Sequence, residues 1–217
     1  MKILLTGFDS FKGVRVNPSE QVVRALGARR RKDNGAELIT AVLPTEYVAA
    51  TRQLRRLIRS ARPDAIVCLG VATRRESISL ERVALNLDDD ATPDNAGIIR
   101  RGRKIAPNGP DVYWTTLPLE RLQQALRRKR VKAYVSNHAG TFLCNHAFYI
   151  AGHEAARARR RIPCGFIHLP GTNRAGAGRG KFKRKYSVAL LVRAVECCLE
   201  VLQRDVVRKH GRTGPNR

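Results

Sequence analysis

Three residues of this 217-residue chain have types and surroundings that suit nucleophilic chemistry: Cys144, His168 and Glu81. Cys144 follows a turn sequence with Gly140 and precedes a helical pattern, so we expect it at a helix N-terminus, where free N–H groups and the helix dipole stabilise a thiolate. His168 lies near the end of the apolar stretch "CGFIHLP" (164–170). A thiolate beside an imidazolium is the usual activated form of a cysteine nucleophile, so these residues suggest acyl transfer.

Glu81 interrupts the otherwise apolar pattern of "SISLERVALNL" (77–87). A carboxylate that accepts a hydrogen bond from one imidazole nitrogen would leave the other nitrogen facing the thiol. The residues alone also allow simpler interpretations. Glu81 can be a solvent-facing residue of an edge strand, and an isolated Cys or His is more often a core or surface residue.

Strand-like apolar stretches alternate with helical patterns along the chain. We expect strands at 2–8, 37–44, 64–70, 77–87, 112–118, 132–136 and 164–170. We expect helices at 18–27, 47–59, 119–129, 144–160 and 186–209. This alternation predicts a single α/β domain over 1–209, with a central, mostly parallel twisted sheet and helices on both faces. Residues 210–217 are predicted to be a flexible basic tail.

Composition favours a cytoplasmic enzyme. The hydrophobic fraction is 43%, no apolar run reaches the length of a membrane span, and the first residues have no signal-peptide cleavage pattern. The five cysteines are scattered and form no CxxC, so neither a disulfide framework nor a zinc site is expected.

The charge is unusual, because 42 Lys and Arg face 18 Asp and Glu, which gives a formal net charge of +24. Basic clusters occur at 28–32, 127–130, 157–161 and 178–185. Such a chain should bind polyanions non-specifically at low salt. No sequence signature of a nucleic-acid-binding fold accompanies the charge, and a solvated basic surface is the simpler interpretation.

Several stretches together resemble the pyroglutamyl peptidase I (pyrrolidone-carboxylate peptidase) family of cysteine peptidases. The most specific are "ISLERVALN" (78–86), "SNHAGTFLCN" (136–145) and "GFIHLP" (165–170). The resemblance implies an α/β fold and a triad of Glu81, Cys144 and His168. The implied reaction removes an N-terminal pyroglutamyl residue from peptides and needs no metal or organic cofactor. The resemblance also implies a homo-oligomer, often a tetramer.

The same resemblance implies a pocket for the lactam ring of pyroglutamate. It places Phe8, Phe11 and Phe142 around the lactam, and Thr45 in the pocket loop. The pattern alone also allows core packing for these aromatic side chains. Thr45 alternatively caps the helix that follows it.

One departure from the family pattern bears on activity, because Ala91 stands where the family usually has an arginine. We hypothesise that Arg74 or Arg75 partly fills that role. Two alternative functions stay open on the sequence. One is a cysteine amidase or peptidase with altered N-terminal specificity, and the other is a catalytically weak basic protein that associates with nucleic acid.

Overall fold

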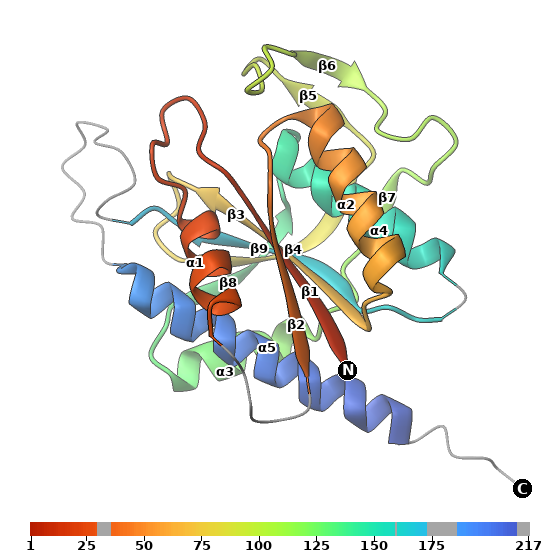
Figure 1. The fold of residues 1–217 in the computed structure, drawn as a ribbon. Coiled ribbons are helices and arrows are strands. Elements are labelled where there is room, and N and C mark those ends of the chain that lie inside the picture. Colours follow the sequence, from red (N-terminus) through yellow and green to blue (C-terminus); the bar gives the residue numbers. More distant parts are fainter. Residues whose placement is uncertain (30–35, 159, 173–185, 212–217) are drawn as a thin grey trace, which may run out of the picture.

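The computed structural model describes residues 1–29, 36–158, 160–172 and 186–211. In this part of the chain, a seven-stranded sheet lies between two layers of helices (Figure 1). Its strands are β1 (Lys2–Phe8), β2 (Glu37–Leu43), β3 (Ala65–Ala72), β4 (Ile78–Leu85), β7 (Val112–Trp114), β8 (Ala133–His138) and β9 (Cys164–Pro170). The helices are α1 (Pro18–Gly27), α2 (Tyr47–Ala61), α3 (Leu119–Arg128), α4 (Leu143–Arg157) and α5 (Val188–Gly211). The predicted α/β fold is confirmed.

The sheet is mixed, and its strand order is β2-β1-β3-β9-β4, after which β4 pairs with both β7 and β8. The four strands from β2 to β9 are mutually parallel. Strand β4 runs antiparallel to β9 and parallel to β8. The N-terminal half of β4 therefore lies beside the C-terminal half of β9.

Helices cover both faces of the sheet (Figure 1), and an apolar core fills the space on each face. Helices α1, α3 and α5 bury residues such as Val22, Leu126 and Leu199 against one face. Helices α2 and α4 bury Leu54 and Phe148 against the other face. The face under α2 and α4 is the one that carries the candidate site.

Helix α1 begins as its sequence predicts, because the Asn17 side chain accepts a hydrogen bond from the Ser19 N–H at 3.0 Å. Helix α2 is capped differently from expectation. The carboxylate of Asp94 accepts the Tyr47 N–H at 2.9 Å. Thr45 instead donates its hydroxyl to the Asp9 carbonyl oxygen at 3.3 Å.

A small two-stranded sheet of β5 (Asp88–Asp90) and β6 (Arg100–Arg103) was not predicted from the sequence. Neither strand has apolar alternation, so no strand signal was present. Charge pairs support the sheet instead: Arg100 binds Asp88 at 2.8 Å, and Arg101 approaches Asp89 at 3.8 Å.

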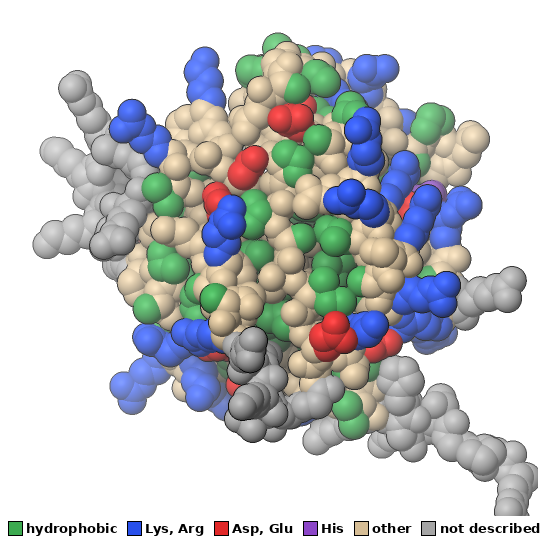
Figure 2. Space-filling view, in the orientation of Figure 1, with side chains coloured by type: hydrophobic (Ala, Val, Ile, Leu, Met, Phe, Trp, Pro, Cys, Tyr) green, Lys and Arg blue, Asp and Glu red, His purple; other side chains and the backbone are tan. Residues whose placement is uncertain are grey.

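Lys and Arg side chains spread across the face in Figure 2, where few acidic groups are visible. The basic cluster at 178–185 lies outside the described residues, as does 212–217 of the predicted tail. The domain boundary at 209 stays a prediction. In the described ranges, no helix is both long and apolar enough to cross a bilayer.

Candidate active site

His168 and Glu81 meet across the antiparallel pair β9 and β4. In the register, His168 faces Ser79 and Glu81 faces Phe166, so His168 and Glu81 are diagonal neighbours on one face of the sheet. His168 Nδ1 and Glu81 Oε1 are 2.7 Å apart. Glu81 is fully buried on an interior strand, which excludes the solvent-facing, edge-strand interpretation.

Two further side chains lie beside the carboxylate of Glu81. The Arg75 guanidinium contacts Glu81 Oε1, and Ser136 faces Glu81 from β8. Burial alone would raise the pKa of Glu81, but the hydrogen bond and charge of His168, together with Ser136 and Arg75, hold it below its usual value. Glu81 is therefore ionised at neutral pH and accepts only. Nδ1 of His168 carries the proton, which leaves Nε2 as an acceptor.

Cys144 is the second residue of α4, as the sequence predicts. The turn before it needs Gly140, whose φ of 84° lies in the left-handed region that favours glycine. N–H groups in the first turn of a helix have no acceptor within the helix. Those around Cys144 are therefore available to a negatively charged oxygen beside the thiol.

The start of α4 is fixed by side chains that sequence analysis did not single out. The buried Asn145 accepts the Leu85 N–H at 2.8 Å and donates to the carbonyl oxygens of Leu85 and Leu87 at 2.9 Å each. His146 Nδ1 lies 2.9 Å from Asp88 Oδ2. These bonds join α4 to the last residue of β4 and to the segment that follows it, and so they fix the position of Cys144 relative to Glu81.

A glycine on β3 makes room for the cysteine. Gly70 is the register partner of His168. A Cβ atom on Gly70 would lie 2.6 Å from Cys144 Sγ and 2.8 Å from Phe166 Cζ, both closer than real Cβ contacts. The thiol therefore lies against the β3–β9 pair at the level of His168, and the structure brings all three sequence-predicted catalytic residues into one neighbourhood.

Burial determines the protonation states of Cys144 and His168 in the free enzyme. It raises the pKa of Cys144 to about 12, with a further contribution from the charge of Glu81 and an opposing one from Arg75. It lowers the pKa of His168, against the opposite effect of Glu81. Both directions favour a neutral thiol and a neutral imidazole, rather than the ion pair that the sequence suggests.

The four residues of the predicted lactam pocket lie on the α2–α4 side of the sheet or in adjoining loops. Phe8 ends β1 and is buried, and Phe11 lies in a turn where its N–H and C=O pair with Val14. Thr45 is buried and donates its N–H to Asp9 Oδ1 at 2.8 Å. Phe142 directly precedes α4, and its ring meets the Tyr47 ring edge-on at 5.8 Å. Their contact with substrate stays a prediction.

The departure at Ala91 falls in an exposed turn directly after β5. Of the two arginines considered as substitutes, Arg74 is exposed, whereas Arg75 is partly buried against Glu81. The sequence does not distinguish Arg74 from Arg75, because their positions relative to Glu81 depend on the turn between β3 and β4.

An α/β protein that gathers a cysteine at a helix N-terminus, a buried histidine and an ionised carboxylate has the site of a cysteine peptidase. A family model described as pyroglutamyl peptidase matches residues 1–205. The chain belongs to the pyroglutamyl peptidase family.

Individual members of the family are similar to this protein over most of its length. The pyrrolidone-carboxylate peptidase of Bacillus cytotoxicus is 34% identical over 214 residues, which cover 97% of this chain and 98% of the relative. The crystal structure of Bacillus amyloliquefaciens pyroglutamyl peptidase I is 35% identical, covers 94% of this chain and 97% of its own, and superposes with a TM-score of 0.85. The pyrrolidone carboxyl peptidase of Pyrococcus furiosus is 31% identical, with coverage of 95% and 100% and a TM-score of 0.88.

Proposed function

We propose that this protein removes N-terminal pyroglutamate from peptides, with Cys144 as nucleophile, His168 as acid–base and Glu81 as the group that orients His168. The observation that carries the proposal is the 2.7 Å bond from His168 to Glu81 on the same sheet face against which the Cys144 thiol rests. Membership of the pyroglutamyl peptidase family supports the substrate class.

The reaction is acyl transfer in two halves. His168 Nε2 accepts the thiol proton as Cys144 Sγ attacks the carbonyl carbon that follows the lactam ring. N–H groups at the start of α4 stabilise the oxyanion. His168 then protonates the leaving amine, which frees the shortened peptide. Water, deprotonated by His168, hydrolyses the thioester, releases pyroglutamate and restores the thiol.

The proposed lactam pocket uses Phe8, Phe11 and Phe142 as apolar walls, with Thr45 beside them in the loop before α2. A small neutral lactam suits such a site, because its methylenes need apolar contacts and its ring amide needs few polar partners. The position of Phe142, two residues before the nucleophile, supports this assignment.

A set of fluorogenic amides tests this function against its alternatives. We expect release of the fluorophore from the pyroglutamyl amide and little from the matched prolyl and glutamyl amides, with loss of turnover after thiol alkylation. Turnover of the other amides alone would favour an altered N-terminal specificity. Absence of turnover would favour the catalytically weak, nucleic-acid-associated alternative.

Gly70→Ala should lower kcat by about 10²-fold, because a catalytic atom displaced by about 1 Å costs that much. The new methyl group would overlap Cys144 Sγ and the Phe166 ring. Steady-state kinetics on the pyroglutamyl amide measures the loss. In a Cys144→Ala background, the same substitution should cost less thermal stability, since one of the two clashes is gone. Wild-type kcat in Gly70→Ala would contradict the proposed placement of the thiol.

Activity should depend on pH through a neutral His168. Because burial lowers the pKa of His168, the imidazole stays unprotonated, and competent as a base, until the pH falls below the ordinary histidine value of about 6.5. The acid limb of kcat/KM should therefore lie below that value. The thiolate absorbance of the native enzyme minus that of Cys144→Ser should stay flat through neutral pH. A thiolate signal already complete at pH 6 would instead reveal an ion pair.

We also propose a homo-oligomer, a tetramer by family resemblance. Trp114 and Val112 on β7 are exposed large apolar residues, and such surface commonly marks an interface. Light scattering coupled to size-exclusion chromatography measures the mass directly, and a monomer at micromolar concentration would contradict this proposal.

We infer a reducing compartment such as the cytoplasm. All five cysteines are free thiols, and the proposed mechanism needs Cys144 reduced. Cell fractionation with immunodetection tests the assignment, and recovery from an oxidising compartment would overturn it.

A further inference from the structure

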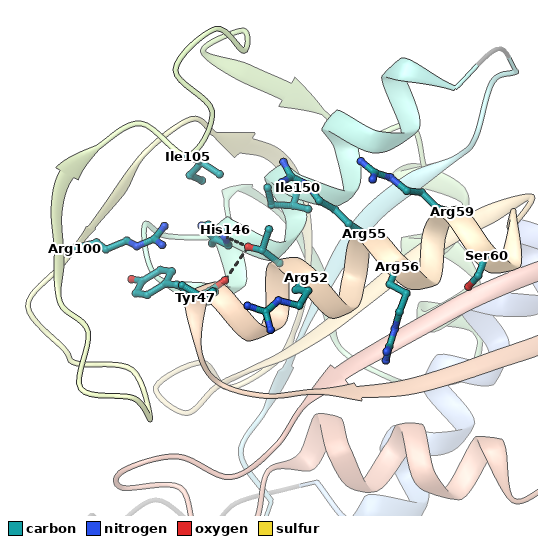
Figure 3. A pocket seen from close by; sticks show the side chains of 12 residues that line it. Tyr47, Arg52, Arg55, Arg56, Arg59, Ser60, Arg100, Ile105, His146 and Ile150 are labelled. Carbon is teal, nitrogen blue, oxygen red and sulfur yellow. Dashed lines mark hydrogen bonds between the residues drawn. The ribbon is translucent and has the colours of Figure 1, made fainter.

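A groove of about 840 Å³ lies over α2, α4 and the start of β6, and arginines dominate its lining (Figure 3). Four of them project from α2, and Arg100 lies across the groove on β6. We call this feature the arginine groove, defined by Arg52, Arg55, Arg56, Arg59 and Arg100.

The arginine groove carries more positive charge than its surroundings neutralise. Glu154 on α4 binds Arg55 at 3.1 Å and Arg59 at 3.4 Å. The buried Asp88 binds Arg100 at 2.8 Å. The carboxylates of Asp90 and Asp94 lie near Tyr47 at one end of the groove. Five guanidinium groups therefore have two ion-paired carboxylates and two more in the neighbourhood, which leaves a net positive charge. Within the described ranges, the exposed Arg52 and Arg56 form no ion pair, so the excess charge is available to an anionic ligand.

The spacing of the α2 arginines suits a row of anionic groups. Arg52, Arg56 and Arg59 follow one another at i, i+4 and i+7, so the Cβ atoms of neighbours are about 5–6 Å apart along one stripe of α2. The Arg59 side chain turns toward Glu154 on α4, whereas Arg52 and Arg56 point to the other side of α2 (Figure 3). The row extends about 10 Å along the helix axis. Each strand of a DNA duplex presents one phosphate per about 3.4 Å of helix axis, so this length corresponds to about three nucleotides. The guanidinium fork matches phosphate oxygens in pairs.

As lined by the described residues, the groove has no exposed aromatic ring on which bases could stack and few free main-chain groups that could bind a peptide backbone. Its aromatic ring, Tyr47, is fully buried, and the Arg100 guanidinium lies 4.3 Å from the ring centroid, so this ring is no platform for base stacking. The main-chain groups inside α2 are bonded within the helix. An acidic peptide would therefore gain only contacts to its carboxylates.

We propose that the arginine groove binds the phosphodiester backbone of nucleic acid, independently of base sequence. Cys144, His168 and Glu81 do not line the arginine groove, but one end of the groove lies beside the start of α4, where His146 lines it and the Tyr47 ring packs on Phe142. Binding of an anion in the groove does not require peptidase activity. Inorganic polyphosphate presents the same chemistry to the groove, and a comparison of oligonucleotide with inorganic triphosphate distinguishes the two ligands.

Fluorescence anisotropy with a labelled, mixed-sequence single-stranded DNA of about 12 nucleotides tests the proposal. Each phosphate contact to a single strand contributes about 0.7 to the slope of log K against log salt concentration. The double variant Arg52→Gln/Arg56→Gln should therefore reduce the slope by about 1.4 between about 50 and 200 mM salt. If the affinities at 1 M salt are equal, binding at about 0.1 M is then about 25-fold weaker.

Matched variants separate the groove from the general charge of the protein. Arg127→Gln/Arg128→Gln removes the same charge from exposed positions on α3 and should leave the slope near that of the native protein. Arg52→Lys/Arg56→Lys keeps the charge and should keep the slope, with weaker binding from the lost fork geometry. Thermal melting checks that each variant is folded.

Three results would overturn the proposal. Equal losses in the α2 and α3 pairs would mean diffuse attraction and no groove site. Binding of inorganic triphosphate without binding of the oligonucleotide would assign the groove to small polyphosphates. Binding of polyglutamate that depends on Arg52 and Arg56, with no oligonucleotide binding, would assign it to an acidic peptide.

Discussion

Cys144→Ser should reduce kcat/KM on a pyroglutamyl amide by about 10⁴-fold or more, because a serine hydroxyl is a far weaker nucleophile than a thiol in the same position. The substitution is nearly isosteric, so the fold should be retained. The assay compares initial rates of the two proteins after matched circular dichroism spectra.

Cys197→Ser is the matched control for this prediction. Cys144 is partly buried, and Cys197 is buried on α5, across the sheet from the site. Cys197→Ser should keep near-native turnover apart from a small packing cost. Near-native turnover in Cys144→Ser, or a comparable loss in Cys197→Ser, would show that the nucleophile has been assigned wrongly.

His168→Ala should lower kcat by about 10²–10⁴-fold, because it removes the group that both accepts the thiol proton and protonates the leaving amine. Glu81→Gln should cost less, since the imidazole stays in place and loses only its anionic partner. The acid limb of kcat/KM should also move to lower pH in Glu81→Gln, because the charge of Glu81 raises the pKa of His168.

The pH profile makes the Glu81 prediction decisive. A role of Glu81 in packing alone would change stability without moving the acid limb. Native rates and an unmoved limb in Glu81→Gln would therefore reduce Glu81 to a structural residue.

The sequence was most informative where a residue broke the local pattern. Glu81 in an apolar strand, and Cys144 after a glycine turn, both violate what packing alone requires, so they could be singled out. The roles of Arg75, Asn145 and Gly70 could not be, because each depends on a partner far along the chain or on strand order. Gly70 in particular looks like an ordinary strand residue until β9 is known to lie beside β3 and α4 above both.

The mixed sheet was also only partly predictable. Alternating strands and helices favour parallel pairing, which holds from β2 to β9. The antiparallel pairing of β4 with β9 could not be predicted, because neither strand has a local sequence pattern that indicates it. The short strands β5 and β6 are held by charge pairs and not by an apolar face, so hydrophobic periodicity could not reveal them.

The insertion of β9 between β3 and β4 has a consequence for how the protein is made. During synthesis, both neighbours emerge long before β9, which begins only at Cys164. Until then the nascent chain has two partial sheets with open, apolar edges, which are prone to pair with other chains. A ribosome stalled before this strand would release a product that lacks His168 and exposes those edges. The nascent chain should therefore need chaperones most before β9 has been synthesised. Catalytic activity should appear only after β9 has been inserted between β3 and β4.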